Sequence, residues 1–237
     1  MAVINNDPYG FIKTPSTIVF ISKRNSGKTI MSKDVIYSLA KRKLINAVYV
    51  ISNTALISND FSCVPSKNIM KFDDAKLEQL ILLQTEAKQK NKNINLCLIL
   101  DDIGSEAHGS KALNFLFTCG RHINITVIVI NQVAKLISPS CRENCDYIFM
   151  GTLGGSSIDS LYESVIYNGN KKQFKDFIND NVKDFNFVCY DNSTTDSTKR
   201  WRRIKATLRN FKLQSKELPK MKDKKIDDNS SSSSDTE

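Results

Sequence analysis

Five short apolar segments rich in β-branched residues recur along the chain, and each predicts a β-strand. They occupy Thr17–Ile21, Ala47–Ile51, Leu96–Leu100, Ile125–Ile130 and Tyr147–Met150. Most of them are continuously apolar and do not alternate with polar residues. This pattern is typical of central strands in a parallel sheet that helices cover on both faces.

Segments with helical spacing separate these strands, and the alternation predicts an α/β fold. The expected helices span Lys28–Lys41, Asp73–Lys90, Lys111–Arg121 and Ile158–Val165. An acidic pair opens the second helix, where a carboxylate caps the first N–H groups and stabilises the positive end of the helix dipole. We therefore expect a mostly parallel central sheet with helices on both faces.

The composition changes after about Asp191, and we place the end of the folded domain, residues 1–191, at that point. Residues 192–214 form a basic segment, since Lys199–Lys212 carries seven basic residues and no acidic one around Trp201. The remainder, 215–237, is rich in lysine and serine and nearly free of apolar residues, which predicts a disordered tail.

The 237 residues suffice for one α/β domain with a buried core, and 41% hydrophobic and 25% charged residues are ordinary for a soluble globular protein. No apolar run approaches the roughly 18 residues that span a bilayer. The amino terminus lacks signal-peptide features, so we expect a protein that is not secreted and keeps its six cysteines reduced. A net charge of +9 suggests an anionic partner such as nucleic acid.

The strongest motif lies between the first strand and the first helix and fits a P-loop, which would bind ATP with Mg²⁺. Its residues are Ser22, Lys23, Arg24, Asn25, Ser26, Gly27, Lys28 and Thr29. Such a loop turns its N–H groups around the phosphates, while Lys28 reaches the β/γ oxygens and the Thr29 hydroxyl meets Mg²⁺. Ser22 departs from the usual glycine, and a chance Gly-Lys-Thr in an unrelated loop is the alternative.

Two further strands end in polar residues that suit ATP hydrolysis. After Leu96–Leu100, Asp101 would hold Mg²⁺ through water and Asp102 would polarise the attacking water. After Ile125–Ile130, Gln132 would sense the γ-phosphate, as in ATPases with an additional strand between the P-loop strand and the acidic strand. A helix cap or turn explains the acids equally simply when they are taken alone, and an ordinary strand exit explains the amide.

The ordered series of motifs resembles the virion DNA-packaging ATPases of poxviruses and other large DNA viruses, a branch of the FtsK/HerA superfamily. The resemblance runs from about Thr17 to Met150 and also includes Val48–Ser52, Gly120–His122 and Pro139–Ile148. It implies a RecA-like P-loop NTPase core and a homo-oligomeric ring of five or six subunits. It also implies ATP-driven translocation of double-stranded DNA into a capsid, in the virion or the viral factory of the host-cell cytoplasm, with capsid proteins as partners.

The resemblance further implies an arginine that completes the active site of the neighbouring subunit, with Arg142 as first candidate and Arg121 as second. A surface arginine bridging to an acid is the alternative for either. Basic side chains near the carboxyl terminus are expected to contact the DNA backbone without reading its sequence, unless they form a solvated face. They are Lys199, Arg200, Arg202 and Arg203.

Two other functions remain open from the sequence. A helicase or a partition ATPase would use the same core. A non-enzymatic DNA-binding protein with a degenerate P-loop is suggested by Ser22 together with the basic carboxyl-terminal segment.

Overall fold

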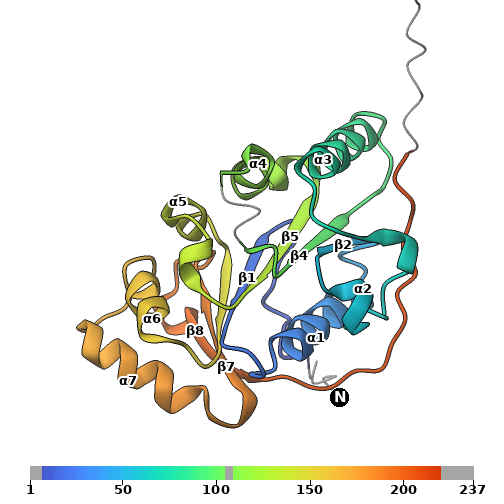
Figure 1. The fold of residues 1–237 in the computed structure, drawn as a ribbon. Helices are drawn as coiled ribbons and strands as arrows, with labels where there is room; N and C mark the ends of the chain where they lie inside the picture. Colours follow the sequence, from blue (N-terminus) through green and yellow to red (C-terminus); the bar gives the residue numbers. More distant parts are fainter. Residues whose placement is uncertain (1–6, 105–108, 220–237) are drawn as a thin grey trace, which may run out of the picture.

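A single mixed sheet forms the centre of the computed structural model, which describes residues 7–104 and 109–219 (Figure 1). The strands are β1 (Thr17–Ile21), β2 (Ala47–Ser52), β3 (Ile69–Met70), β4 (Leu96–Asp101), β5 (Ile125–Asn131), β6 (Tyr147–Met150), β7 (Asn186–Asp191) and β8 (Trp201–Lys205). Their order is β3-β2-β4-β5-β1-β6-β7-β8, and all neighbours pair parallel except β6 with β7 and β7 with β8, which pair antiparallel. The predicted strands and the mostly parallel sheet are confirmed.

Helices cover both faces of this sheet, as expected. They are α1 (Lys28–Lys41), α2 (Ala55–Ser58), α3 (Asp74–Gln89), α4 (Lys111–Cys119), α5 (Pro139–Glu143), α6 (Gly155–Tyr162) and α7 (Lys171–Asn181). The predicted cap of α3 is confirmed, since the Asp73 carboxylate accepts hydrogen bonds from the N–H groups of Ala75 and Lys76. Among the residues with a described position, no helix has the length and apolarity to cross a membrane.

The two faces of the sheet carry separate hydrophobic cores. One lies under α1 and α2 and includes Tyr9 and Ile12 from the amino-terminal segment. The other lies under α3, α4, α6 and α7 (Figure 1). Because both faces of the central strands are buried, these strands read as continuously apolar in the sequence.

The predicted domain boundary after Asp191 is wrong. Strand β8 extends the sheet, with Trp201 opposite Tyr190 and Lys205 opposite Asn186. The Trp201 ring lies 4.9 Å from the Tyr190 ring, and Ile204 is buried. Composition concealed this edge strand because its basic side chains outnumber its apolar ones while its backbone completes the sheet.

Residues 206–219 form what we call the C-terminal strap, which runs around the outside of α1 and α2 (Figure 1). The Leu213 N–H donates to the Cys63 carbonyl at 2.8 Å, and the Ser215 hydroxyl accepts from the Val48 N–H at 2.9 Å. Leu218 is buried. The predicted disordered tail therefore begins too early, because residues 215–219 pack on the domain, and its remainder, 220–237, lies outside the described residues.

Candidate nucleotide site

The P-loop leaves the carboxyl end of β1 and enters α1 at Lys28. Asn25 and Gly27 adopt left-handed backbone conformations with φ of 57° and 87°, which glycine tolerates best. The Ser26 hydroxyl and the Lys28 ammonium both donate to the Lys23 carbonyl, at 2.6 and 2.7 Å. These bonds close the loop on itself and lay the Lys28 side chain across it.

Ser22, which replaces the usual first glycine of the motif, is fully buried. Its hydroxyl donates to the Thr152 carbonyl at 3.1 Å. A Cβ on Gly151 would lie 2.9 Å from the Ser22 Cβ and 2.8 Å from the Phe187 ring. Because Gly151 has no side chain, the fold has room for Ser22, and the departure from the motif is accommodated by β6.

Asp101 ends β4 and faces Ser52, its register partner on β2. The Ser52 hydroxyl donates to the Asp101 carboxylate at 3.1 Å. Only 9% of Asp101 is exposed, and this burial raises the pKa of its carboxyl to about 6. A bound cation would offset the cost of this buried negative charge.

Asp102 follows in a left-handed bend with φ of 48°, and its N–H donates to the Ile130 carbonyl at 3.0 Å. The bend brings its carboxylate to β5, where the Gln132 amide donates to it at 3.1 Å. The Gln132 amide oxygen accepts from the Arg24 guanidinium at 3.1 Å. Gln132 thus connects the acidic strand to the P-loop.

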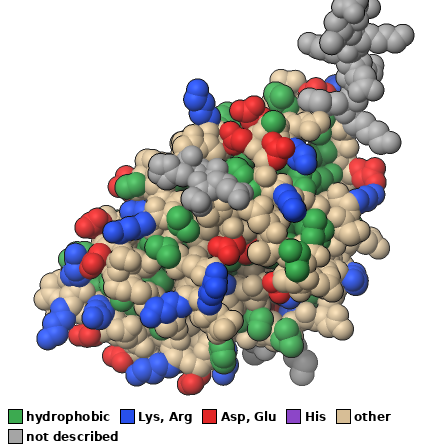
Figure 2. All heavy atoms as spheres, in the orientation of Figure 1, with side chains coloured by type: hydrophobic (Ala, Val, Ile, Leu, Met, Phe, Trp, Pro, Cys, Tyr) green, Lys and Arg blue, Asp and Glu red, His purple; other side chains and the backbone are tan. Residues whose placement is uncertain are grey.

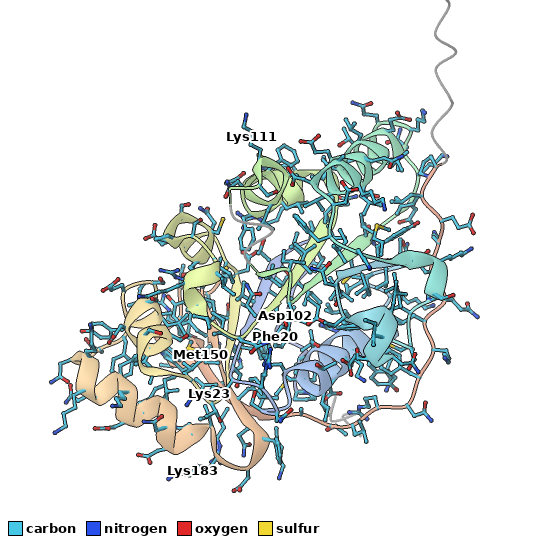
Figure 3. All side chains as sticks on the ribbon, viewed as in Figure 1. Phe20, Lys23, Asp102, Lys111, Met150 and Lys183 are labelled. Carbon is cyan, nitrogen blue, oxygen red and sulfur yellow. The ribbon has the colours of Figure 1, made fainter. Side chains whose placement is uncertain are left out.

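These side chains meet because β5 lies between β1 and β4 in parallel register, so the carboxyl ends of all three strands reach one edge. This is the additional strand that the sequence suggested. Asp102 and Lys23 both lie at this edge (Figure 3). Burial lowers the pKa of Lys28, and the negative charges of Asp102 and Asp101 oppose that shift. Lys28 therefore lies close enough to Asp101 and Asp102 to interact electrostatically with both carboxylates.

The edge has the groups that a triphosphate and Mg²⁺ require. Loop N–H groups and the first turn of α1 suit phosphates, while the Thr29 hydroxyl and the Asp101 carboxylate are oxygen ligands. Over residues 7–104 and 109–219 no cluster of three His, Cys, Asp or Glu side chains forms a complete metal cage. Mg²⁺ suits such a sparse site, since it takes few protein ligands and completes its shell with phosphates and water.

The structure contradicts the expectation that Arg142 acts on a neighbouring subunit. Arg142 is 5% exposed, and its guanidinium donates to the Ser164 hydroxyl at 2.9 Å and the Ala134 carbonyl at 3.1 Å. It also donates to the Ile137 carbonyl at 2.5 Å. A guanidinium satisfied by its own chain in this way holds α5 in place and is not presented to another subunit.

Arg121 lies at the opposite edge of the sheet from the P-loop. It pairs with Asp146 at 2.9 Å, and Asp146 also accepts from the Thr17 N–H at the start of β1. This is the bridge to an acid that the sequence left open as an alternative. The side chain is 43% exposed, so a role in another subunit stays a prediction.

The four basic residues expected to contact DNA do not form one free stripe. Arg202 pairs with Asp191 at 3.0 Å and lies 4.0 Å over the Phe11 ring. Lys199 pairs with Asp196 at 3.1 Å, and Arg200 donates to the Thr194 carbonyl at 3.1 Å. Arg203 is exposed. On the face shown in Figure 2, Lys and Arg side chains are interspersed with Asp and Glu.

Sequence reasoning missed two residues that shape the site, Ser52 and Gly151. Ser52 ends the strand next to the acidic strand. A polar residue at the carboxyl end of a parallel strand could have indicated its place in the site. Gly151 likewise follows β6 directly, at the same edge.

A P-loop, an acidic strand end and the inserted β5 on a mostly parallel sheet define a P-loop NTPase. The chain belongs to the family described as "Poxvirus A32 protein", whose model matches residues 8–200. The family predicted from the ordered motifs is thereby confirmed.

Individual relatives agree with this assignment. Over 177 residues the chain is 23% identical to DNA packaging protein OPG160 of Variola virus, covering 71% of this chain and 64% of that protein. It is 29% identical over 139 residues to uncharacterized protein 015R of Frog virus 3, covering 56% of this chain and 42% of that one. The chain thus spans less than two thirds of either curated relative.

Among solved structures, the genome packaging NTPase B204 from Sulfolobus turreted icosahedral virus 2, in complex with AMPPCP, has the same fold. The TM-score is 0.58 at 16% identity, over 81% of this chain and 98% of that one. The form in complex with sulfate gives a TM-score of 0.60 at 17% identity, over 81% and 97%.

Proposed function

We propose that this chain hydrolyses ATP with Mg²⁺ and uses the energy to translocate double-stranded DNA during packaging of a viral genome into a capsid. The observation that carries the proposal is the connected series Asp102, Gln132 and Arg24 beside Lys28. It joins the acidic strand, the inserted strand and the P-loop at one point. The matched relatives named as packaging proteins support DNA as the translocated substrate and genome packaging as the process.

In this proposal each residue has a distinct task. Lys28 and the loop N–H groups hold the β- and γ-phosphates, while Thr29 and, through water, Asp101 would hold Mg²⁺, which would neutralise charge on the phosphate oxygens. Asp102 orients the attacking water in line with the γ-phosphorus. Gln132 reports the γ-phosphate, because it bonds Asp102 on one side and Arg24 of the P-loop on the other.

We propose that the active assembly is a ring of five or six identical subunits. It would act with capsid proteins in the virion or in the viral factory of the host-cell cytoplasm. With Arg142 buried, Arg121 remains the arginine proposed to act between subunits. For the DNA backbone we propose the two exposed residues, Arg203 and Lys199, as the leading contacts, because Arg200 and Arg202 are half-buried and bonded within the chain.

ATP turnover with and without duplex DNA tests the proposal on the wild type, Lys28→Ala and, as a control, Lys41→Ala at the exposed end of α1. We expect DNA to stimulate the wild type and the control alike. Lys28→Ala should lower the rate at least about 100-fold, because it removes a charge that stabilises the transferring phosphoryl group. Equal, DNA-independent turnover in all three proteins would contradict the proposal. Strand separation on forked DNA without duplex translocation would identify a helicase instead.

A further inference from the structure

The turn between α7 and β7 places an exposed aromatic ring against the P-loop. Phe185 is 62% exposed, yet its Cδ1 lies 3.4 Å from the position that a Cβ on Gly27 would occupy. The buried Phe187 ring lies behind it, 3.9 Å from the same position. A segment more than 150 residues along the chain thus lies directly on the loop that holds phosphates.

The backbone of this turn adopts a conformation that a phenylalanine rarely takes. Asp184 and Phe185 have φ of 57° and 59°, two consecutive left-handed residues, neither of them glycine. The Asn186 side-chain amide donates to the Lys183 carbonyl at 2.7 Å and closes the turn. Burial in the core does not account for the arrangement, since 62% of Phe185 is exposed. Strained backbone of this kind is concentrated at ligand sites.

The position of the turn relative to the site indicates which part of a nucleotide it meets. Asp102 and Gln132 mark the γ-phosphate end, so the ribose and the base must leave the loop in the other direction. In the sheet order, Asp102 and Gln132 follow β4 and β5 on one side of β1, whereas Phe185 directly precedes β7 on the other side. The exposed ring therefore lies on the side where the base emerges.

We propose that Phe185 is the stacking platform for the nucleobase of the bound nucleoside triphosphate, an inference that rests on the proposed function. An aromatic face stacks on any base and reads no hydrogen-bonding pattern. The platform thus adds affinity for the nucleoside part of the ligand and discriminates weakly between ATP and GTP. Ile30, the residue after Thr29, is 37% exposed and offers a second apolar surface on the first turn of α1.

The test compares two ligands that share phosphates and differ in the base. Dissociation constants for ATP and for inorganic tripolyphosphate, each with Mg²⁺, are measured calorimetrically on the wild type, Phe185→Ala and Ile166→Ala. Ile166 is a matched control, because it is 63% exposed and apolar. We expect Phe185→Ala to raise the dissociation constant for ATP about tenfold or more and to leave that for tripolyphosphate unchanged. Ile166→Ala should change neither.

Phe185→Trp adds a spectroscopic reading that a purely structural residue would not give. ATP should quench the new tryptophan fluorescence relative to the wild type, and tripolyphosphate should not. If Phe185→Ala weakens both ligands equally, or neither, the stacking role is overturned while the nucleotide site stands. A wild type that binds neither ligand overturns the nucleotide site itself and with it the proposed function.

Discussion

Asp101 carries its charge at a place where the fold gives it little compensation. Ser52 donates one hydrogen bond, and burial raises the pKa of the carboxyl from 3.8 to about 6. Well below pH 3.8 the group is protonated in both the folded and the unfolded chain, so it does not affect the free energy of unfolding. Between pH 3.8 and about 6 the unfolded chain ionises first, and above about 6 the folded chain must hold a charge that the unfolded chain holds more easily. Ionisation then lowers the free energy of unfolding by about 2–3 kcal/mol.

Asp101→Asn should therefore stabilise the chain while it abolishes ATP hydrolysis. In buffer without nucleotide or Mg²⁺, we expect the free energy of unfolding of the variant to exceed that of the wild type by about 1–3 kcal/mol at pH 7.5 and to approach it near about pH 3. Denaturant unfolding at several pH values measures this difference. Asp176→Asn, at an exposed acid on α7, is the control. A gain that does not vary with pH would mean that the buried charge is not its cause.

Among the elements, β1 and β6 depend on each other through Ser22 and Gly151, which follow them directly. Gly151→Ala should destabilise the chain by about 1–3 kcal/mol, because the new methyl overlaps the Ser22 side chain and the Phe187 ring. Adding Ser22→Gly should recover part of that loss, since it relieves one of the two overlaps. A double-mutant cycle in urea measures the coupling. Strictly additive effects would show that Ser22 does not occupy the space that Gly151 leaves.

The same elements show what sequence could and could not predict. Strands buried on both faces are apolar throughout, so β1 and β4 were found with nearly their true ends. The sequence also identified Asp102 and Gln132 at the ends of two strands, and the parallel sheet brings both to the edge that carries the P-loop. Strand β8 was not predicted, because an edge strand needs few apolar side chains and its sequence therefore lacks the apolar pattern of a strand. The burial of Arg142 could not be predicted either, because it depends on carbonyl groups that only the folded chain places around the guanidinium.

Across the whole molecule, the C-terminal strap links β8, at one edge of the sheet, to the region of β2 and β3 near the other. Near its start the strap meets Asp34 of α1, which is 1% exposed and accepts from the Arg209 guanidinium and the Thr207 N–H, each at 2.8 Å. The Tyr9 hydroxyl is the third donor, at 2.8 Å. The strap thus supplies two of the three donors that satisfy a buried carboxylate.

A chain that ends after Lys205 should consequently lose about 3–5 kcal/mol of stability, because Asp34 loses the Arg209 and Thr207 donors and, among the described residues, keeps Tyr9 alone. A chain that ends after Pro219 retains the strap and should unfold like the full sequence. Thermal unfolding of the three proteins measures the difference. Asp34→Asn should recover part of the loss in the shorter chain, since the amide needs no charged partner, and should destabilise the full sequence. If the substitution has the same sign in both, the strap stabilises the fold by covering apolar surface and not through Asp34.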